Sequence, residues 1–477
     1  DVSGMLLFNQ SDEINTKATN VEEALPYRFR GLAGRFTYGF DDRYFAEFNF
    51  GYNGSENFTP KNRYGFFPSV GLGWVISNES FFEPLTNVIQ YLKVRGTWGQ
   101  VGNSQISGRR FAYLATVTDS SSTSYTFGKN MDQNYGTTAI DEYAVDVTWE
   151  VADKTDIGVD MRLLNNKLNL QFDYFKESRE GIYLRRSSIP SYVGMINNPY
   201  GNIGKVENKG FELSVNYANS WGGDWSLSLM GNYSFNRNKV LEDDSTVVYP
   251  WQNTIGNKVG QRFGLVALGL FESYGEIAAS PVQTGDTRPG DIKYKDINGD
   301  GKIDEYDKVP IGWGSVPEIM YGFGFSVGWK NLSLTAMFQG VAHVDAMLSG
   351  EGVLPFSQGS SRGNLLSNIT DRWTEENPRQ NAFYPRLSIG NINMNYEEST
   401  WWLKDTDYLR LKNIELSYRL PDHWMKRIHL DNARIFIQGV NLLTFSSFKI
   451  WDVELGDGRG ARYPNIASVS LGVNFNF

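Results

Sequence analysis

The sequence contains no cysteine, only three histidines and no apolar run near the roughly 20 residues that a membrane-spanning helix requires. The lack of cysteine excludes thiol catalysis, a cysteine-based zinc site and a disulfide framework. The histidines His343, His423 and His429 have no metal-ligand spacing. His343 and Asp345 could form a base and its orienting acid, but an ordinary loop histidine is the simpler explanation. We therefore expect no catalytic residues and a protein that is not an enzyme.

Long runs of positive charge are also absent. The net charge is -9 and no block of lysine or arginine occurs, so nucleic acid is not an expected partner. Acidic pairs such as Glu22-Glu23 and Glu375-Glu376 fall between the expected strands, where solvated loop charge explains them best. No glycine-rich phosphate-binding loop is present.

Aromatic residues are abundant, at 14% of the chain, and many short segments alternate polar and apolar residues. At the end of the sequence, Val469, Leu471, Val473, Phe475 and Phe477 alternate with serine, glycine and asparagine. Side chains of a strand alternate between its faces, so this segment has one apolar and one polar face. Similar segments predict about 14 strands. They lie near residues 5–8, 29–40, 44–53, 68–76, 91–101, 156–164, 168–175, 211–217, 225–235, 321–329, 332–338, 409–420, 433–442 and 466–477. The predicted fold class is all-β.

The connections between these strands are alternately short and long. Short turns are expected at 41–42, 165–166, 220–224 and 330–331, and long loops at 54–66, 102–154, 179–208, 239–316, 342–405 and 444–463. This asymmetry is typical of a transmembrane antiparallel β-barrel, whose long loops are extracellular and whose apolar side chains face lipid. Aromatic girdles at the interfaces are expected from Tyr44, Trp74, Trp98, Trp221, Trp225 and Trp329. A passive porin and a secreted calcium-stabilised adhesin remain as alternatives.

Residues 296–307 read Asp-Ile-Asn-Gly-Asp-Gly-Lys-Ile-Asp-Glu-Tyr-Asp and fit the calcium-loop pattern D-x-N-x-D-G. The expected calcium ligands are the side chains of Asp296, Asn298, Asp300, Asp304 and Asp307 and the carbonyl of Lys302. The loop ends in aspartate instead of glutamate, and no helix pair flanks it. The pattern therefore predicts a structural calcium ion in loop 239–316 and not a sensor. A calcium-free turn rich in aspartate and asparagine is the alternative.

Several further segments match a known family in order along the chain. They are residues 26–35, 42–44, 93–103, 148–150, 208–212, 290–294, 407–413, 439–442 and 463–477. Together they resemble the SusC/RagA family of TonB-dependent transporters. The resemblance implies a barrel of about 22 strands, filled by an N-terminal plug, in a Bacteroidetes-type outer membrane. We expect residues 1–477 to form the C-terminal part of such a barrel, with the plug, the TonB-binding segment and the first barrel strands absent.

The family resemblance also implies partners and a transport function. The implied partners are a SusD/RagB-like surface lipoprotein and the TonB-ExbB-ExbD complex, and the transporter-lipoprotein pair could form a dimer. Oligosaccharide import is the leading expectation, and oligopeptide import is the alternative; siderophore or cobalamin import fits the resemblance less well. Aromatic rings in long loops favour sugars, because ring faces stack on them. The candidate substrate-binding residues are Trp251, Trp313, Trp373, Trp401, Trp402 and Trp451.

Overall fold

The computed structural model describes residues 1–18, 21–106, 109–357, 365–427 and 430–476. Fourteen strands form one sheet in which neighbours in space follow one another along the chain. The strands are β1 (Val2–Glu13), β2 (Tyr27–Phe40), β3 (Tyr44–Ser55), β4 (Tyr64–Val75), β5 (Ile89–Asn103), β8 (Glu150–Leu163), β9 (Leu168–Arg185), β10 (Tyr200–Trp221), β11 (Trp225–Glu242), β18 (Ile319–Trp329), β19 (Leu332–Ala342), β22 (Tyr408–Arg419), β23 (Asn432–Ser446) and β24 (Ser468–Asn476). Each matches an expected segment, so the all-β fold class is confirmed.

Shorter elements lie in the connections. The strands are β6 (Thr116–Phe127), β7 (Gln133–Glu142), β12 (Arg262–Gly264), β13 (Ala267–Leu270), β14 (Val282–Gln283), β15 (Ile292–Tyr294), β16 (Lys302–Ile303), β17 (Val309–Ile311), β20 (Asp345–Met347) and β21 (Leu403–Asp405). The α-helices are α1 (Val21–Ala24), α2 (Tyr274–Ala278) and α3 (Asp422–Arg427). Within the described ranges, no helix is long and apolar enough to cross a membrane.

Each long strand has an apolar and a polar face, and the strand register aligns these faces across the sheet. Leu213 of β10 lies opposite Phe172 of β9, whereas its neighbour Glu212 lies opposite Asp173. Leu213 is 38% exposed and Phe172 is 43% exposed, because the protein covers neither of them. A continuous apolar face of this kind is stable against lipid and not against water.

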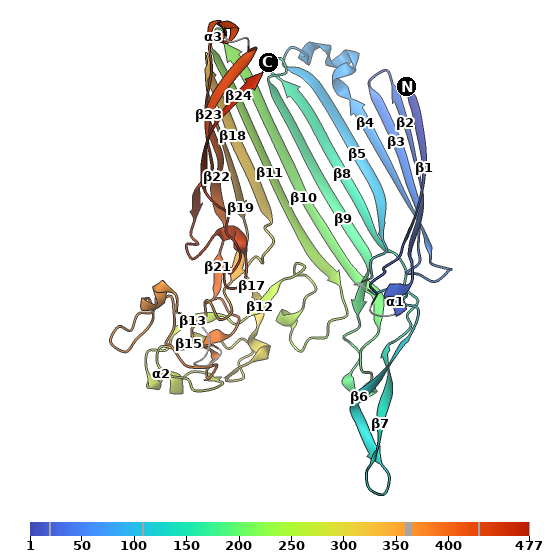
Figure 1. The fold of residues 1–477 in the computed structure, drawn as a ribbon, viewed down its shortest axis with the longest axis vertical. Coiled ribbons are helices and arrows are strands. Elements are labelled where there is room, and N and C mark those ends of the chain that lie inside the picture. The colour runs from blue at the N-terminus through green and yellow to red at the C-terminus, as the bar shows by residue number, and fades with distance from the viewer. Residues whose placement is uncertain (19–20, 107–108, 358–364, 428–429, 477) are drawn as a thin grey trace.

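Short and long connections lie at opposite ends of the sheet, as the sequence predicted. The turn between β2 and β3 holds Asp41 and Asp42 at φ of 53° and 49°, a left-handed conformation that aspartate tolerates in tight hairpins. Figure 1 places the short turns and both termini at one end, and the long loops with the β6–β7 hairpin at the other.

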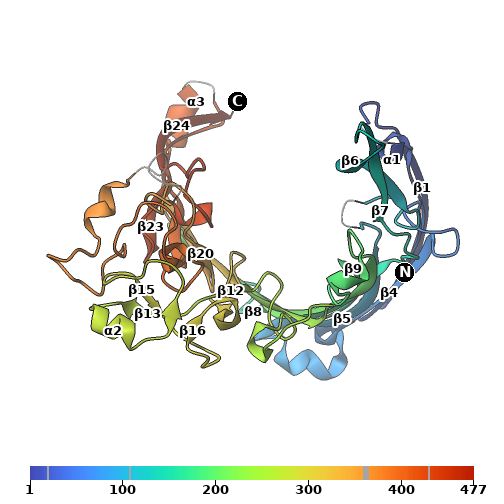
Figure 2. The same ribbon diagram turned by 90° about the horizontal axis from the view of Figure 1, so that it is seen from below.

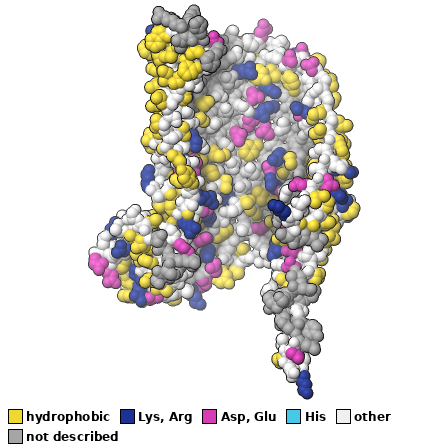
Figure 3. All heavy atoms as spheres, in the orientation of Figure 1, with side chains coloured by type: hydrophobic (Ala, Val, Ile, Leu, Met, Phe, Trp, Pro, Cys, Tyr) yellow, Lys and Arg dark blue, Asp and Glu magenta, His cyan; other side chains and the backbone are white. Residues whose placement is uncertain are grey.

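The sheet curves into an arc that does not close on itself. Figure 2 shows this arc from the loop end, with β1 and β24 on its two sides. Among the described residues, β1 pairs only with β2 and β24 only with β23. Figure 3 looks into the hollow of the arc, where acidic and basic side chains gather, while hydrophobic side chains border it on both flanks.

The long loops fold into a body with its own hydrophobic core, which we call the loop assembly. It comprises the described residues of 243–318, 343–407 and 447–467. Buried side chains from all three segments pack together, including Ile292, Trp402 and Val453. The sequence predicted only long loops for these segments, because their apolar residues are scattered and follow neither strand nor helix periodicity.

Candidate functional site

The concave face of the sheet carries a charged cluster centred on Arg95 of β5. Arg95 pairs with Asp156 and Asp160 of β8 at 2.9 and 3.4 Å, and also with Asp173 of β9. The guanidinium reaches across β8 because Gly158 leaves room. A Cβ atom at Gly158 would lie 2.4 Å from the Asp173 carboxylate and 2.5 Å from the guanidinium carbon of Arg95. One arginine among three carboxylates leaves this cluster with a net negative charge.

A cavity of about 770 Å³ lies on the same face, near the loop end of β9, β10 and β11. Its lining combines the charged residues Glu150, Glu177 and Arg179 with the aliphatic residues Ile182, Leu184 and Val206. The guanidinium of Arg179 pairs with Glu177 at 2.8 Å and with Glu150 at 3.1 Å. None of these residues was expected from the sequence, because they meet only when separate strands pair and residues 254–263 line the same cavity.

Trp313 is the most exposed of the candidate substrate-binding tryptophans, at 43%. Its ring stacks on His343 with centroids 3.9 Å apart and planes inclined by 3°. Glu318 accepts hydrogen bonds from Arg237 at 2.7 Å and contacts Nδ1 of His343 at 3.2 Å. Asp345 instead accepts the backbone amides of Trp313 and Gly314, so it does not act as the orienting acid of His343.

Two of the candidate tryptophans are core residues, which corrects the sequence expectation. Trp373 is 5% exposed and Trp402 is 1% exposed, and both belong to the core of the loop assembly. The indole of Trp402 donates to the backbone carbonyl of Asn395 at 2.7 Å. Trp401 and Trp451 pack against the same core and are half-buried. Residue type and loop position did not distinguish a surface ring from a core ring.

The remaining candidate, Trp251, supports the loop with the calcium pattern. It lies in the short helix η4 (Pro250–Gln252), and its indole donates to the backbone carbonyl of Tyr306 at 2.8 Å. Gln252 donates to the neighbouring carbonyl of Glu305 at 2.9 Å. These contacts hold the helix η5 (Glu305–Asp307), which ends that loop.

In the calcium-pattern loop itself, the candidate ligands accept hydrogen bonds from backbone amides. Asp296 accepts the amides of Gly299 and Gly301 at 2.6 and 2.9 Å, and Asn298 accepts the amide of Asp300 at 3.0 Å. Asp307 is fully buried and accepts the amides of Ile297 and Asp304 at 2.7 and 2.9 Å. Over the described residues, no group of three or more histidine, cysteine, aspartate or glutamate side chains is placed to hold a metal ion.

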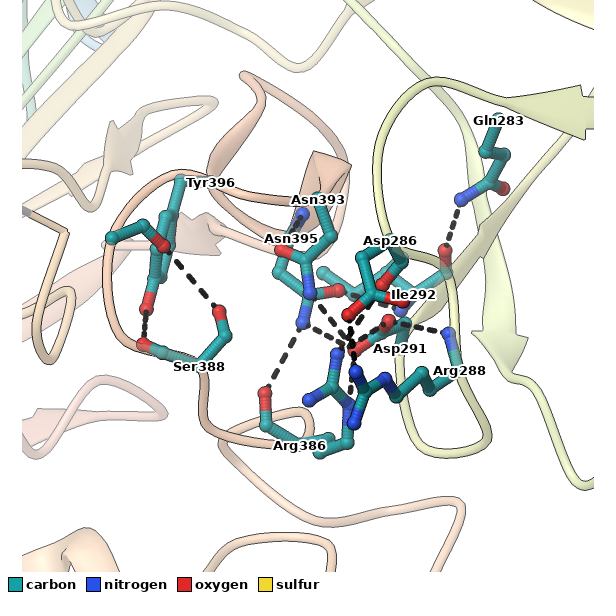
Figure 4. A network of polar contacts seen from close by, with 11 residues as sticks. Gln283, Asp286, Arg288, Asp291, Ile292, Arg386, Ser388, Asn393, Asn395 and Tyr396 are labelled. Atoms are coloured by element: carbon teal, nitrogen blue, oxygen red, sulfur yellow. Dashed lines mark hydrogen bonds and ion pairs between the residues drawn. The ribbon is translucent and has the colours of Figure 1, made fainter.

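A buried polar cluster joins two segments of the loop assembly at Asp291 (Figure 4). The Asp291 carboxylate is 1% exposed and accepts two hydrogen bonds of 3.0 Å from Arg386. Asn393 and Asn395 donate to the same carboxylate at 3.1 and 2.9 Å, and the amide of Arg288 donates at 2.8 Å. Because every donor approaches one buried carboxylate, this cluster fixes residues 286–292 against residues 386–395.

An apolar outer face, a polar hollow and a folded loop assembly at one end define part of the wall of a membrane β-barrel protein. The family model for "TonB dependent receptor-like, beta-barrel" matches residues 8–442, and the chain belongs to this family. This match confirms the family expected from the sequence. The family comprises transporters and receptors and is not an enzyme family. Its barrels lie in the outer membrane, so the protein is an outer-membrane β-barrel.

Individual relatives show the same relationship. The chain is 28% identical to TonB-dependent receptor P3 of Formosa agariphila, over 93% of this chain and 45% of that protein. It is 27% identical to TonB-dependent receptor SusC of Bacteroides thetaiotaomicron, over 93% of this chain and 43% of that protein. The chain thus spans somewhat less than half the length of these relatives. In fold it is similar to the RagAB peptide transporter, with a TM-score of 0.71 and 22% identity over 97% of this chain and 50% of that one.

Proposed function

We propose that the protein imports oligomeric nutrients across the outer membrane, with a SusD/RagB-like surface lipoprotein over its extracellular loops and with energy delivered through TonB, ExbB and ExbD. The observation that carries the proposal is the polar concave face behind an apolar outer face. Carboxylates, amides and hydroxyls such as Glu212, Gln171 and Ser234 line this hollow, where a polar solute could exchange its hydrogen bonds with water for hydrogen bonds with the wall.

For the substrate, we propose oligosaccharides, with oligopeptides as the second candidate. The wall of the hollow, rich in amides and carboxylates, suits a sugar, which needs many hydrogen bonds. We call the cavity of about 770 Å³ near the loop end of β9, β10 and β11 the rim cavity. Its aliphatic side chains Ile182, Leu184 and Val206 suit a peptide side chain instead, and RagAB, which is similar in fold, is named a peptide transporter.

The transport proposal is tested by uptake into cells with and without the gene for this protein. Labelled oligosaccharides and labelled oligopeptides of similar mass are offered separately, before and after collapse of the proton gradient. Gradient-dependent uptake of one class supports import and identifies the substrate. Uptake of small solutes that survives loss of the gradient would instead indicate a passive pore. Purification in mild detergent followed by mass spectrometry should recover a surface lipoprotein alongside.

We also propose that residues 296–307 bind a structural calcium ion. The oxygens of Asp296, Asn298, Asp300 and Asp304 and the carbonyl of Lys302 fit calcium in kind and spacing. Gly299 and Gly301 have φ of 76° and 81°, which bends the chain as such a loop requires. Asp307 accepts the backbone amides of Ile297 and Asp304, and would contribute by holding the two ends of the loop together.

The calcium proposal is tested on purified protein by elemental analysis after exchange into calcium-containing buffer. The variant Asp296→Ala/Asp300→Ala should lose one equivalent of calcium and become sensitive to proteolysis within 285–316. Asp371→Ala, which removes a carboxylate elsewhere in the loop assembly, serves as the matched control. Equal calcium content in all three proteins would show that the loop is a metal-free turn.

A further inference from the structure

The outer face of β9, β10 and β11 carries three cations side by side. Lys209 of β10 lies directly opposite Lys176 of β9 and directly opposite Arg237 of β11. We call these three residues the basic row. Their side chains are 50%, 57% and 49% exposed for Lys176, Lys209 and Arg237 respectively. Like charges directly opposite one another in a sheet are destabilising, so this arrangement needs a compensating partner.

The basic row belongs to the lipid-facing side. One step toward the membrane on the same face, Phe211 of β10 lies opposite Tyr174 of β9 and Phe235 of β11. The rings of Phe211 and Phe235 are 5.8 Å apart, and the guanidinium of Arg237 lies over the Phe235 ring at 5.5 Å. The cations therefore stand directly above an aromatic patch on the outer surface.

The position of Lys209 along β10 places it at the membrane boundary. On the outer face, the apolar band runs from Trp221 at the short-turn end to Phe211, and Lys209 comes next. These ten residue steps span about 34 Å along the strand, which a tilt of 35–45° reduces to about 26 Å of membrane depth. That height agrees with the roughly 25 Å apolar band of outer-membrane barrels, so the basic row lies at the level of the outer-leaflet headgroups.

The protein supplies only part of the negative charge that the basic row needs. Glu207 contacts Lys176 at 2.7 Å and Lys209 at 3.7 Å, and Glu318 pairs with Arg237 at 2.7 Å. Lys239, opposite Glu207 and exposed, adds a fourth cation. Lys258 contacts Glu318 at 3.8 Å and adds a fifth cation. Asp153 of β8, opposite Ser178 on the same face, adds a third carboxylate, so five cations against three carboxylates leave a local excess of two positive charges. On the β8 side the row ends at the uncharged Thr155, which lies opposite Lys176.

We infer that the basic row binds the phosphate groups of a phosphorylated lipid headgroup in the outer leaflet. Neighbouring strands are about 4.8 Å apart, so the three cations span about 10 Å, enough to contact a headgroup with two phosphates. The aromatic patch below would pack against the acyl chains of the same lipid. Bound lipid anchors the barrel wall beside the rim cavity, which β9, β10 and β11 line on their opposite face.

The test is lipid binding by the protein purified from outer membranes, measured by native mass spectrometry. The probe is a bis-phosphorylated glucosamine acyl lipid, compared with its dephosphorylated form, with phosphatidylethanolamine and with inorganic phosphate. Lys176→Gln/Lys209→Gln should weaken binding of the phosphorylated lipid about 30-fold, and Lys209→Gln alone about 5-fold. Lys176→Arg/Lys209→Arg should bind within twofold of the parent protein, because the charges remain.

The control variant is Lys154→Gln, which removes a lysine of comparable exposure, 52%, from the concave face of β8. It should leave lipid binding unchanged. The inference is overturned if the double glutamine variant binds as the parent does, or if Lys154→Gln shows the same loss. Equal binding of the dephosphorylated lipid, or displacement by millimolar inorganic phosphate alone, would also overturn it. Heat-dependent gel mobility confirms that each variant has a folded barrel, and Lys209→Gln serves if the double variant does not fold.

Discussion

Replacing Val215 with arginine tests the orientation of the barrel wall. Val215 lies near the middle of the apolar band of β10, opposite Leu170 of β9 and Gly231 of β11 on the outer face. An arginine facing lipid at the bilayer midplane costs about 2–4 kcal/mol. The neighbouring residue Asn216 faces the hollow, where an arginine reaches water and should cost less than about 1 kcal/mol. The two substitutions should therefore differ by roughly 2–3 kcal/mol in the free energy of unfolding.

The measurement is reversible unfolding by guanidinium chloride in lipid vesicles, followed by tryptophan fluorescence and by heat-dependent gel mobility. Val215→Arg should shift the midpoint strongly toward lower denaturant, whereas Asn216→Arg should unfold close to the parent protein. If both variants lose the same stability, or if Asn216→Arg is the worse of the two, the assignment of lipid-facing and hollow-facing sides is wrong.

Three further predictions concern individual sites. Gly158→Ala should displace Arg95 and its carboxylate partners on the concave wall and destabilise the barrel by about 1–3 kcal/mol. Unfolding indistinguishable from that of the parent protein would contradict the close approach of the Arg95 guanidinium to Gly158. Asp291→Ala removes the carboxylate that accepts hydrogen bonds from Arg386 and the neighbouring asparagines, at a local cost of about 3–5 kcal/mol. Hydrogen exchange in residues 286–292 and 386–395 should therefore rise, while the barrel strands stay protected. Unchanged exchange would refute the role of this cluster. Burial raises the pKa of Tyr294, so its contribution to stability is present below its unfolded pKa of about 10 and is lost as pH rises through the folded value. Its ultraviolet ionisation should therefore occur only together with opening of the loop assembly at strongly alkaline pH, and independent titration near pH 10 would contradict its burial.

The strands and turns of this protein were readable in the sequence because both are local. The alternation around Leu213 and Glu212 specifies a strand with one apolar and one polar face, and Asp41-Asp42 favours a tight hairpin turn. The candidate ligands of residues 296–307 were visible for the same reason, since a metal-binding loop of this kind lies in consecutive residues.

The residues of the candidate site were mostly not predictable, because they meet through long-range pairing. Trp373 and Trp402 look like exposed loop rings in the sequence, and only the packing of three distant segments makes them core residues. Lys176, Lys209 and Arg237 are ordinary strand residues until the register of β9, β10 and β11 aligns them.

The sequence by itself determined the class of the protein, because every strand of a membrane barrel repeats the same local pattern. Apolar side chains, which face lipid, alternate with polar ones along the strand. The tertiary structure decided which side chains share a surface. Cross-strand register and loop packing set the rim cavity, the Asp291 cluster and the basic row, and these depend on contacts between residues far apart in the chain.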